Sequence, residues 1–238
     1  ISRTVRDAIV NAGKKPMNLP ENFHPIPQYT PYTDLFYDMT LYRLIYELRI
    51  QDQDSISIAK TITHWLRMQR EASPEGLVHL RFLSNHDTAD WTWDAARPIY
   101  VHGPDRAKAY WVLLTMIDGV PLLHAGDEDS SLYHREGSDL NDFFRTLNQV
   151  RAEWTDTKGE TIYQDREDAV ISFYRIDEVR NQVIRVFINL GEDAISDTVL
   201  HGKKMIFSDK ARLLSDLLIL ESSGYAIFDW DVYERTFE

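Results

Sequence analysis

Apolar positions follow two different periodicities along this chain, and the change falls near residue 155. Before it, short apolar runs typical of strands alternate with segments whose apolar residues recur every three or four positions, as in a helix. The predicted strands cover 15–22, 34–39, 80–83 and 120–125, and the predicted helices cover about 3–14, 40–48, 55–69, 104–117 and 140–153. This alternation predicts a parallel sheet with crossover helices.

After residue 155 the apolar positions recur every second residue, which is the pattern of half-buried strands. The predicted strands there cover 169–175, 183–190, 194–200, 204–208 and 224–230, with turn signals between them. Their number and spacing predict an antiparallel β-sandwich of roughly 80 residues. The sequence therefore divides into an α/β part, 1–154, and an all-β part, 155–238.

Each predicted strand of the α/β part ends near an acidic residue, namely Glu21, Asp38, Asp87 or Asp127. In a parallel βα sheet that closes into a barrel, the carboxyl ends of all strands lie on one face. These carboxylates are therefore expected to gather at one site.

The most informative stretch is Leu80–Thr88, in which an apolar run ends in Asn85-His86-Asp87. Asn85 offers a donor and an acceptor, His86 has a side chain whose charge changes near neutral pH, and Asp87 offers a carboxylate. A buried parallel strand delivers such residues to an active site at its carboxyl end. The alternative is a strand followed by an ordinary Asn/Asp turn.

Composition narrows the possible functions of the 238-residue chain. The net charge of −12 argues against a nucleic-acid partner, because binding phosphate requires clustered Lys and Arg. The chain has no cysteine, which excludes disulfides, thiolate nucleophiles and zinc–thiolate sites. No apolar run is long enough for a membrane helix, and no signal peptide is visible, so the localisation is left open between the cytoplasm and secretion.

Two stretches resemble the α-amylase superfamily, glycoside hydrolase family 13. The run 82–87, Phe-Leu-Ser-Asn-His-Asp, is similar to the motif of that family's seventh strand, and 112–128 is similar to its seventh helix and eighth strand. The resemblance implies the C-terminal half of a (β/α)8 (TIM) barrel followed by a β-sandwich domain. The family's first four strands and its nucleophile, an Asp within an Arg-x-Asp motif, have no counterpart in this chain.

The resemblance also implies roles for individual residues. Glu21 corresponds to the general acid and Asp87 to the stabiliser of the transition state, although Pro20 departs from the family pattern. His86 and Asn85 would bind sugar hydroxyls, His24 would line the site, and Trp91 would stack on a sugar ring. The alternatives are a solvated loop carboxylate for Glu21, satisfaction of loop backbone groups for His86 and Asp87, and loop packing for Trp91.

Asp127, Glu128 and Asp129 have the charge and oxygen atoms for calcium, but a solvated turn is the preferred interpretation, so no cofactor is predicted. The predicted substrate is an oligosaccharide or α-glucan, and the predicted partner is a chain carrying the N-terminal half of the barrel. Without that half, inward residues such as Leu80 and Phe82 are expected to lack facing partners.

Two other functions stay open. A non-catalytic binding or scaffold protein could be built on an α-amylase-like fold, and the missing nucleophile favours it. A stand-alone α/β protein with a different sheet is the third possibility.

Overall fold

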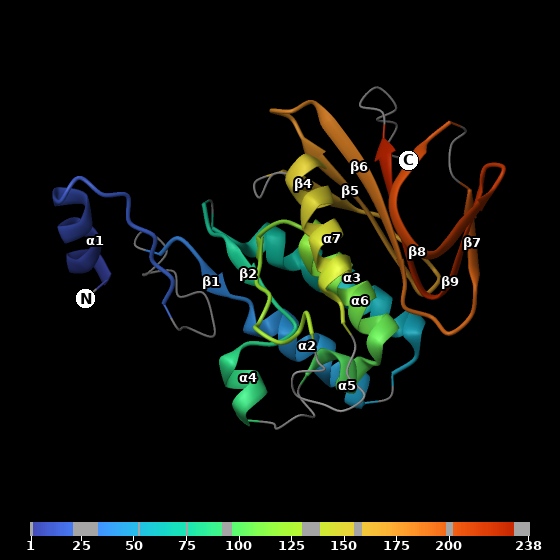
Figure 1. Ribbon diagram of the computed structural model, residues 1–238, viewed down its shortest axis with the longest axis horizontal. Coiled ribbons are helices and arrows are strands. Elements are labelled where there is room, and N and C mark those ends of the chain that lie inside the picture. The colour runs from blue at the N-terminus through green and yellow to red at the C-terminus, as the bar shows by residue number, and fades with distance from the viewer. Residues whose placement is uncertain are drawn as a thin grey trace.

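The computed structural model describes residues 2–20, 33–51, 53–74, 76–91, 97–129, 139–154, 159–198 and 202–230 (Figure 1). It is a mixed α/β structure with a small parallel sheet, a larger antiparallel sheet and helices packed between and around them (Figure 1). No helix in these ranges is long and apolar enough to cross a bilayer.

The parallel sheet has the order β1-β2-β3, with strands β1 (Phe36–Tyr37), β2 (His79–Arg81) and β3 (Val120–Pro121). Tyr37 pairs with Leu80, and Leu80 pairs with Val120, so the predicted parallel pairing is confirmed for these three strands. The prediction of a strand at 15–22 is wrong for its described part, because residues 14–20 form no regular element. Two prolines in that segment, Pro16 and Pro20, lack the N–H that a paired strand must donate.

The five predicted helices are confirmed: α1 (Ser2–Asn11), α2 (Met39–Ile50), α3 (Ser55–Ala72), α6 (Pro104–Met116) and α7 (Asn141–Trp154). Two shorter ones, α4 (His86–Trp91) and α5 (Pro98–His102), occupy a segment that the sequence predicted to be a loop. Their few turns are too short for hydrophobic periodicity to reveal.

Arginine 151 of α7 ties the end of α6 to the parallel sheet. Its guanidinium donates to the carbonyl oxygens of Thr115, Ile117 (3.0 Å) and Gly119 (2.6 Å). The last carbonyls of a helix have no partner within the helix, so a buried cation there satisfies them and complements the helix dipole.

The antiparallel sheet has six strands: β4 (Glu160–Tyr163), β5 (Val170–Asp177), β6 (Gln182–Asn189), β7 (Ile195–Thr198), β8 (Lys204–Leu214) and β9 (Leu217–Trp230). The order is β4-β5-β6-β9-β7, and β8 pairs along most of β9. β9 pairs with β7 through its first residues and with β6 through its last, so the sheet curls around it (Figure 1).

The predicted strands in this part differ from the structure in three places. The strand predicted at 204–208 continues to Leu214 as β8. The turn expected at 222–224 is instead a bend inside β9, where Ser223 has φ of 56°. Gly224 fits there because a Cβ would lie 2.4 Å from the carbonyl oxygen of Lys210. β4 was not predicted, since its four residues, Glu160–Tyr163, show too short an alternation to distinguish from a loop.

One continuous apolar core joins the helices to one face of the antiparallel sheet. It contains Leu41, Ile62 and Leu113 from the helices and Phe173 and Ile188 from the strands. A second cluster, around Phe187 and Phe228, fills the inside of the curl. The division at residue 154/155 stays a prediction, since the two parts share the first core.

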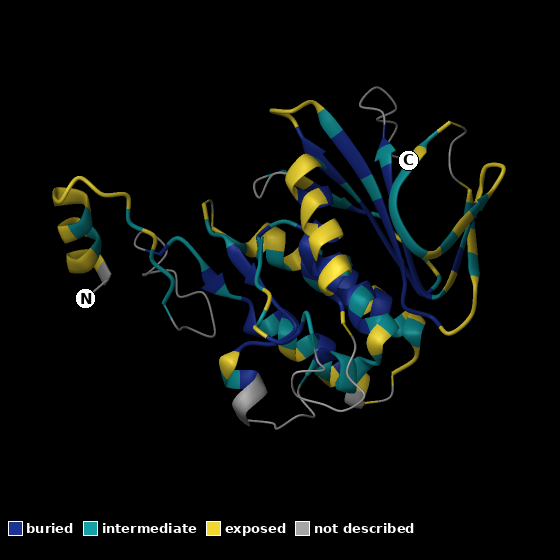
Figure 2. Cartoon of the chain, viewed as in Figure 1, coloured by how far each residue is buried: buried dark blue, intermediate teal, exposed yellow. Residues whose placement is uncertain are grey.

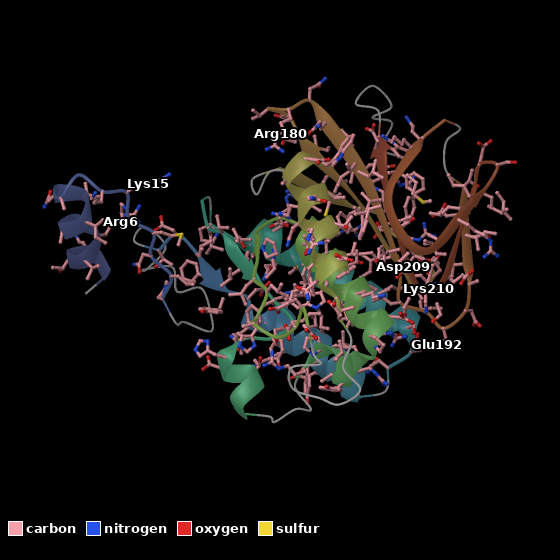
Figure 3. All side chains as sticks on the ribbon, viewed as in Figure 1. Arg6, Lys15, Arg180, Glu192, Asp209 and Lys210 are labelled. Carbon is pink, nitrogen blue, oxygen red and sulfur yellow. The ribbon has the colours of Figure 1, made fainter. Side chains whose placement is uncertain are left out.

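Ion pairs connect the start of α6 to loops and strands of the antiparallel sheet. The pairs are Arg106–Glu192 (2.7 Å), Lys108–Asp209 (3.3 Å) and Lys210–Asp105 (2.5 Å), and the labelled residues Glu192, Asp209 and Lys210 lie close together in Figure 3. Such exposed pairs contribute little individually, so the shared apolar core stabilises this contact more than they do.

Helix α1 stands apart from the rest of the molecule (Figure 1) and most of its residues are exposed (Figure 2). Val5 and Val10 are 51% and 54% exposed.

The sheet residues Leu80 and Phe82 are buried, and the Phe82 ring packs on Tyr37 and Tyr42. The expectation that these two sheet residues lack facing partners is therefore wrong, because both are buried and the rings of Tyr37 and Tyr42 pack on Phe82.

Replacing Gly119 by alanine should lower the free energy of unfolding by about 2–4 kcal/mol. The residue has φ of 108°, and a Cβ there would lie 2.6 Å from the carbonyl oxygen of His79. Denaturant unfolding measures the change, and Gly202→Ala is the matched control, because that glycine has φ of 82° and nothing near its Cβ position. Equal losses in the two variants would show that the close approach to β2 carries no cost of its own.

Candidate active site

The candidate site lies where the three parallel strands end. Because β1, β2 and β3 run in the same direction, Asp38, the segment 82–87 and the segment 122–127 all follow the carboxyl edge of this sheet. The middle strand leads directly into α4, which begins at His86. Residues 85–87 therefore follow a parallel strand, and their roles in a site stay a prediction.

Asparagine 85 caps the start of α4. Its Oδ1 accepts a hydrogen bond from the backbone N–H of Thr88 (2.9 Å), and the Thr88 hydroxyl accepts from the backbone N–H of Asn85 (2.8 Å). This reciprocal arrangement is a capping box with threonine in the second position. Asn85 is buried, and its Nδ2 has no partner in the described part of the chain, so both N–H donors of the amide stay available.

His86 and Asp87 form the first turn of α4, and both reach the surface. Their side chains are 52% and 31% exposed, and the His86 Nε2 lies 3.5 Å from the Asp87 Oδ1. An acidic residue in the first turn complements the helix dipole, which is the structural role of Asp87. Its partial exposure leaves the carboxylate accessible to a ligand. The structure thus brings together Asn85, His86 and Asp87.

A buried network at the ends of β2 and β3 was not predicted. The Asp127 carboxylate accepts hydrogen bonds from the Ser84 hydroxyl (2.5 Å) and from the Arg97 guanidinium (3.1 Å). Arg97 also contacts the His124 Nδ1 at 3.2 Å. Burial raises the pKa of Asp127, and the hydrogen bonds from Ser84 and Arg97 oppose that shift. The network joins the ends of β2 and β3. No sequence pattern indicates that Ser84 lies next to Asp127, which is distant in the chain.

The acidic turn after β3 is committed to protein contacts. Both carboxylate oxygens of Asp127 are engaged, and the Glu128 carboxylate accepts from the backbone N–H of Gly126 (2.8 Å). No group of three acidic or histidine side chains close enough to bind a metal occurs among the described residues. The predicted solvated turn is wrong for Asp127, because this residue is only 5% exposed.

Asp38 is wrong as a member of the site, because its carboxylate serves the fold. It accepts from the backbone N–H of Leu41 (3.2 Å), which caps α2, and from the Gln69 Nε2 (3.0 Å). It also forms a buried ion pair with Arg81, whose guanidinium contacts Asp118 (3.2 Å) as well. Burial would lower the pKa of Arg81, but the carboxylates of Asp38 and Asp118 outweigh it and raise that pKa.

Three predicted site residues cannot be compared with the geometry. Glu21 and His24 lie outside the described residues, and Trp91 is described only as the last residue of α4. What the described part offers is a donor from Asn85, an imidazole from His86 and a carboxylate from Asp87. These groups suit hydrogen bonding to ligand hydroxyls.

Neither a protein-family model nor a curated protein sequence matches this chain. Solved structures do match: an α-amylase from H. orenii has a TM-score of 0.72 at 14% identity, and the match covers 97% of this chain and 56% of that one. A debranching enzyme from Nostoc punctiforme has a TM-score of 0.71 at 15% identity, covering 96% and 54%.

A noncanonic maltogenic α-amylase from Thermotoga neapolitana has a TM-score of 0.68 at 20% identity, covering 97% of this chain and 56% of the other. The chain thus spans about half the length of these enzymes, and the likeness is one of fold. The resemblance seen in the sequence is confirmed at that level: this chain is built like the C-terminal part of α-amylase-family enzymes.

Proposed function

We propose that this chain is the C-terminal half of a (β/α)8 barrel with its β-sandwich domain, within a retaining glycoside hydrolase or transglycosidase that acts on α-glucosidic linkages. One observation carries the proposal: Asn85, His86 and Asp87 follow the middle strand of a parallel sheet whose fold is shared with α-amylases. The remaining strands and the nucleophile would come from the rest of a longer protein or from another chain.

In this proposal Asp87 stabilises the transition state while Asn85 and His86 hold sugar hydroxyls. The Asn85 Nδ2 has no partner among the described residues, so a ligand oxygen that accepts from it would offset its desolvation. Glu21 protonates the leaving oxygen, and His24 and Trp91 line the site. Retention requires a second carboxylate roughly 5–5.5 Å from the acid, which the other half would provide.

The role of Glu21 can be tested by changing the leaving group. Glu21→Gln should lower the rate of hydrolysis of maltooligosaccharides by about 10²–10⁴-fold and that of activated aryl glycosides much less. Only the leaving-group oxygen of the maltooligosaccharides needs protonation. Initial rates on both substrates measure the difference, and Glu71→Gln on the exposed face of α3 is the control. Equal losses on the two substrates would contradict the assignment.

A binding or scaffold protein is the second candidate function. The capping role of Asn85 favours it, because the motif then has a structural use that needs no substrate. Such a protein would bind maltooligosaccharides without hydrolysing them. The same rate measurements would then show no release of reducing ends.

The other half of the barrel would dock on the N-terminal side of β1. There α1 exposes Val5 and Val10, and Met17 is 76% exposed. Both outer edges of the parallel sheet, at β1 and β3, are also open within the described residues, and open edges pair with other chains.

Light scattering of residues 1–238 alone should therefore show that copies of the chain associate with one another. The double variant Val5→Asp/Val10→Asp should associate less. Val179→Asp is the matched control, since Val179 is equally apolar and more exposed but lies in the β5–β6 hairpin. A monodisperse monomer with a hydrogen-exchange-protected parallel sheet would contradict the need for another half.

A further inference from the structure

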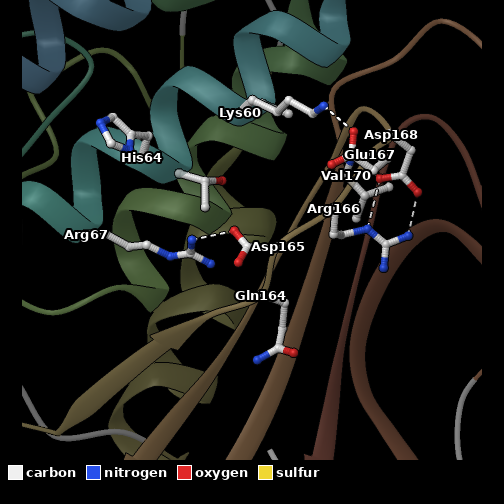
Figure 4. Close-up of a pocket in the computed structure, with 11 residues that line it drawn as sticks. Lys60, His64, Arg67, Gln164, Asp165, Arg166, Glu167, Asp168 and Val170 are labelled. Carbon is white, nitrogen blue, oxygen red and sulfur yellow. Dashed lines mark hydrogen bonds and ion pairs between the residues drawn. The ribbon is translucent and has the colours of Figure 1, made fainter. Parts of the chain in front are cut away.

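A cavity lies on elements that do not carry the candidate active site. It has a volume of about 260 Å³ and opens between α3 and the loop that joins β4 to β5 (Figure 4). Ala59 and Val170 form a small apolar floor, and polar side chains of both elements form the walls. The volume is below the roughly 300–1,000 Å³ of pockets for drug-sized ligands, so it suits a ligand of about one sugar ring.

The charges on its walls neutralise one another. Lys60 pairs with Glu167 at 2.5 Å, Arg67 pairs with Asp165, and Arg166 pairs with Asp168 at 2.5 Å (Figure 4). Three cations therefore face three carboxylates. An ionic ligand would have to displace one member of a pair, whereas a neutral ligand would leave all the pairs intact.

Three further groups on the walls can bind a neutral ligand. The Thr63 hydroxyl, the His64 imidazole and the Gln164 side-chain amide line the cavity, and none of these side chains forms a hydrogen bond or ion pair within the described residues. Thr63 as a residue is only 8% exposed. Hydroxyl, imidazole and amide groups each both donate and accept, which matches the hydroxyl groups of a sugar.

We propose that this cavity binds one ring of a neutral saccharide, at a site separate from Asn85, His86 and Asp87. None of the described residues that line it is aromatic, so they offer a base nothing to stack on, and the self-neutralised walls disfavour phosphates. A bound ring contacts α3 on one side and the β4–β5 loop on the other. It therefore links the helical layer to the antiparallel sheet.

Proton NMR of the imidazole signals tests the proposal directly. The full chain in an Asp87→Asn background is titrated with maltose and, separately, with inorganic phosphate, and the His64 and His86 signals are assigned from His64→Gln and His86→Gln. We expect maltose to shift the His64 signal and phosphate to leave it unchanged. Thr63→Val and Gln164→Ala should each weaken the maltose response by about three- to tenfold.

Two matched variants serve as controls: Thr61→Val, exposed on the same helix, and Gln149→Ala, exposed on α7, should leave the response unchanged. An unshifted His64 signal, a shift with phosphate, or a maltose response insensitive to Thr63→Val and Gln164→Ala would overturn the proposal. The His86 signal keeps the two sites apart. A maltose shift at His86 without one at His64 would contradict saccharide binding in this cavity and would leave the proposed function intact. A shift at His64 without one at His86 would support the cavity proposal and weaken the proposed function.

Discussion

Asp87→Asn should lower kcat on maltooligosaccharides by at least about 10²–10³-fold, the loss typical of removing one preorganised transition-state contact. The substituted amide keeps the size of the carboxylate but lacks its charge, so a developing positive centre on the sugar loses its stabilisation. Initial rates with saturating substrate, in the protein that carries this chain, measure the effect.

The fold should survive this change. Asp87 is partly exposed, and its one described ion-pair contact is the 3.5 Å approach to His86. Exposed pairs of this kind contribute about 0–1 kcal/mol. Asp105→Asn is the matched control, since Asp105 is also an acidic residue in the first turn of a helix and pairs with Lys210 at the surface. Near-normal turnover of Asp87→Asn would remove Asp87 from the mechanism.

Asp38→Ala should lower the free energy of unfolding by about 3–5 kcal/mol, because it leaves a buried guanidinium without its main partner. Both Asp38 and Arg81 are almost fully buried, whereas the second partner of Arg81, Asp118, is partly exposed. The variant also loses the cap of α2. Urea unfolding followed by circular dichroism measures the change.

The double variant Asp38→Ala/Arg81→Met separates charge from packing. An apolar side chain of similar length needs no counter-charge, so the double variant should regain most of the lost stability. Asp142→Ala, which breaks the exposed pair with Arg145, should change little. A loss below about 1 kcal/mol in Asp38→Ala would show that water, not Asp38, satisfies Arg81.

Long periodic elements could be predicted from the sequence, and short or long-range features could not. Helix α3 keeps an apolar stripe over several turns, so its position followed from spacing, whereas α6 is a long apolar helix buried on nearly all sides. The bend within β9 was interpreted as a turn, because serine and glycine at 222–224 are common to both. Only the partner strand β8, which follows β9 through the bend, distinguishes the two.

The candidate site shows the same division. Asn85, His86 and Asp87 could be found because they are adjacent and end an apolar run. Ser84, Arg97 and His124 could not, since their network with Asp127 forms only when β2 and β3 lie side by side. Asp38 was misassigned because a strand-end carboxylate has the same sequence pattern whether it faces a ligand or a buried arginine.

The anomeric configuration of the first product tests the proposed function most directly. Proton NMR of maltoheptaose, recorded within seconds of adding the protein that carries this chain, should show reducing ends released as the α-anomer before mutarotation. The same protein with Asp87→Asn should release about 10²–10³-fold fewer. Initial release of the β-anomer, or no release by a preparation that contains the complete barrel, would contradict a retaining enzyme of α-glucans.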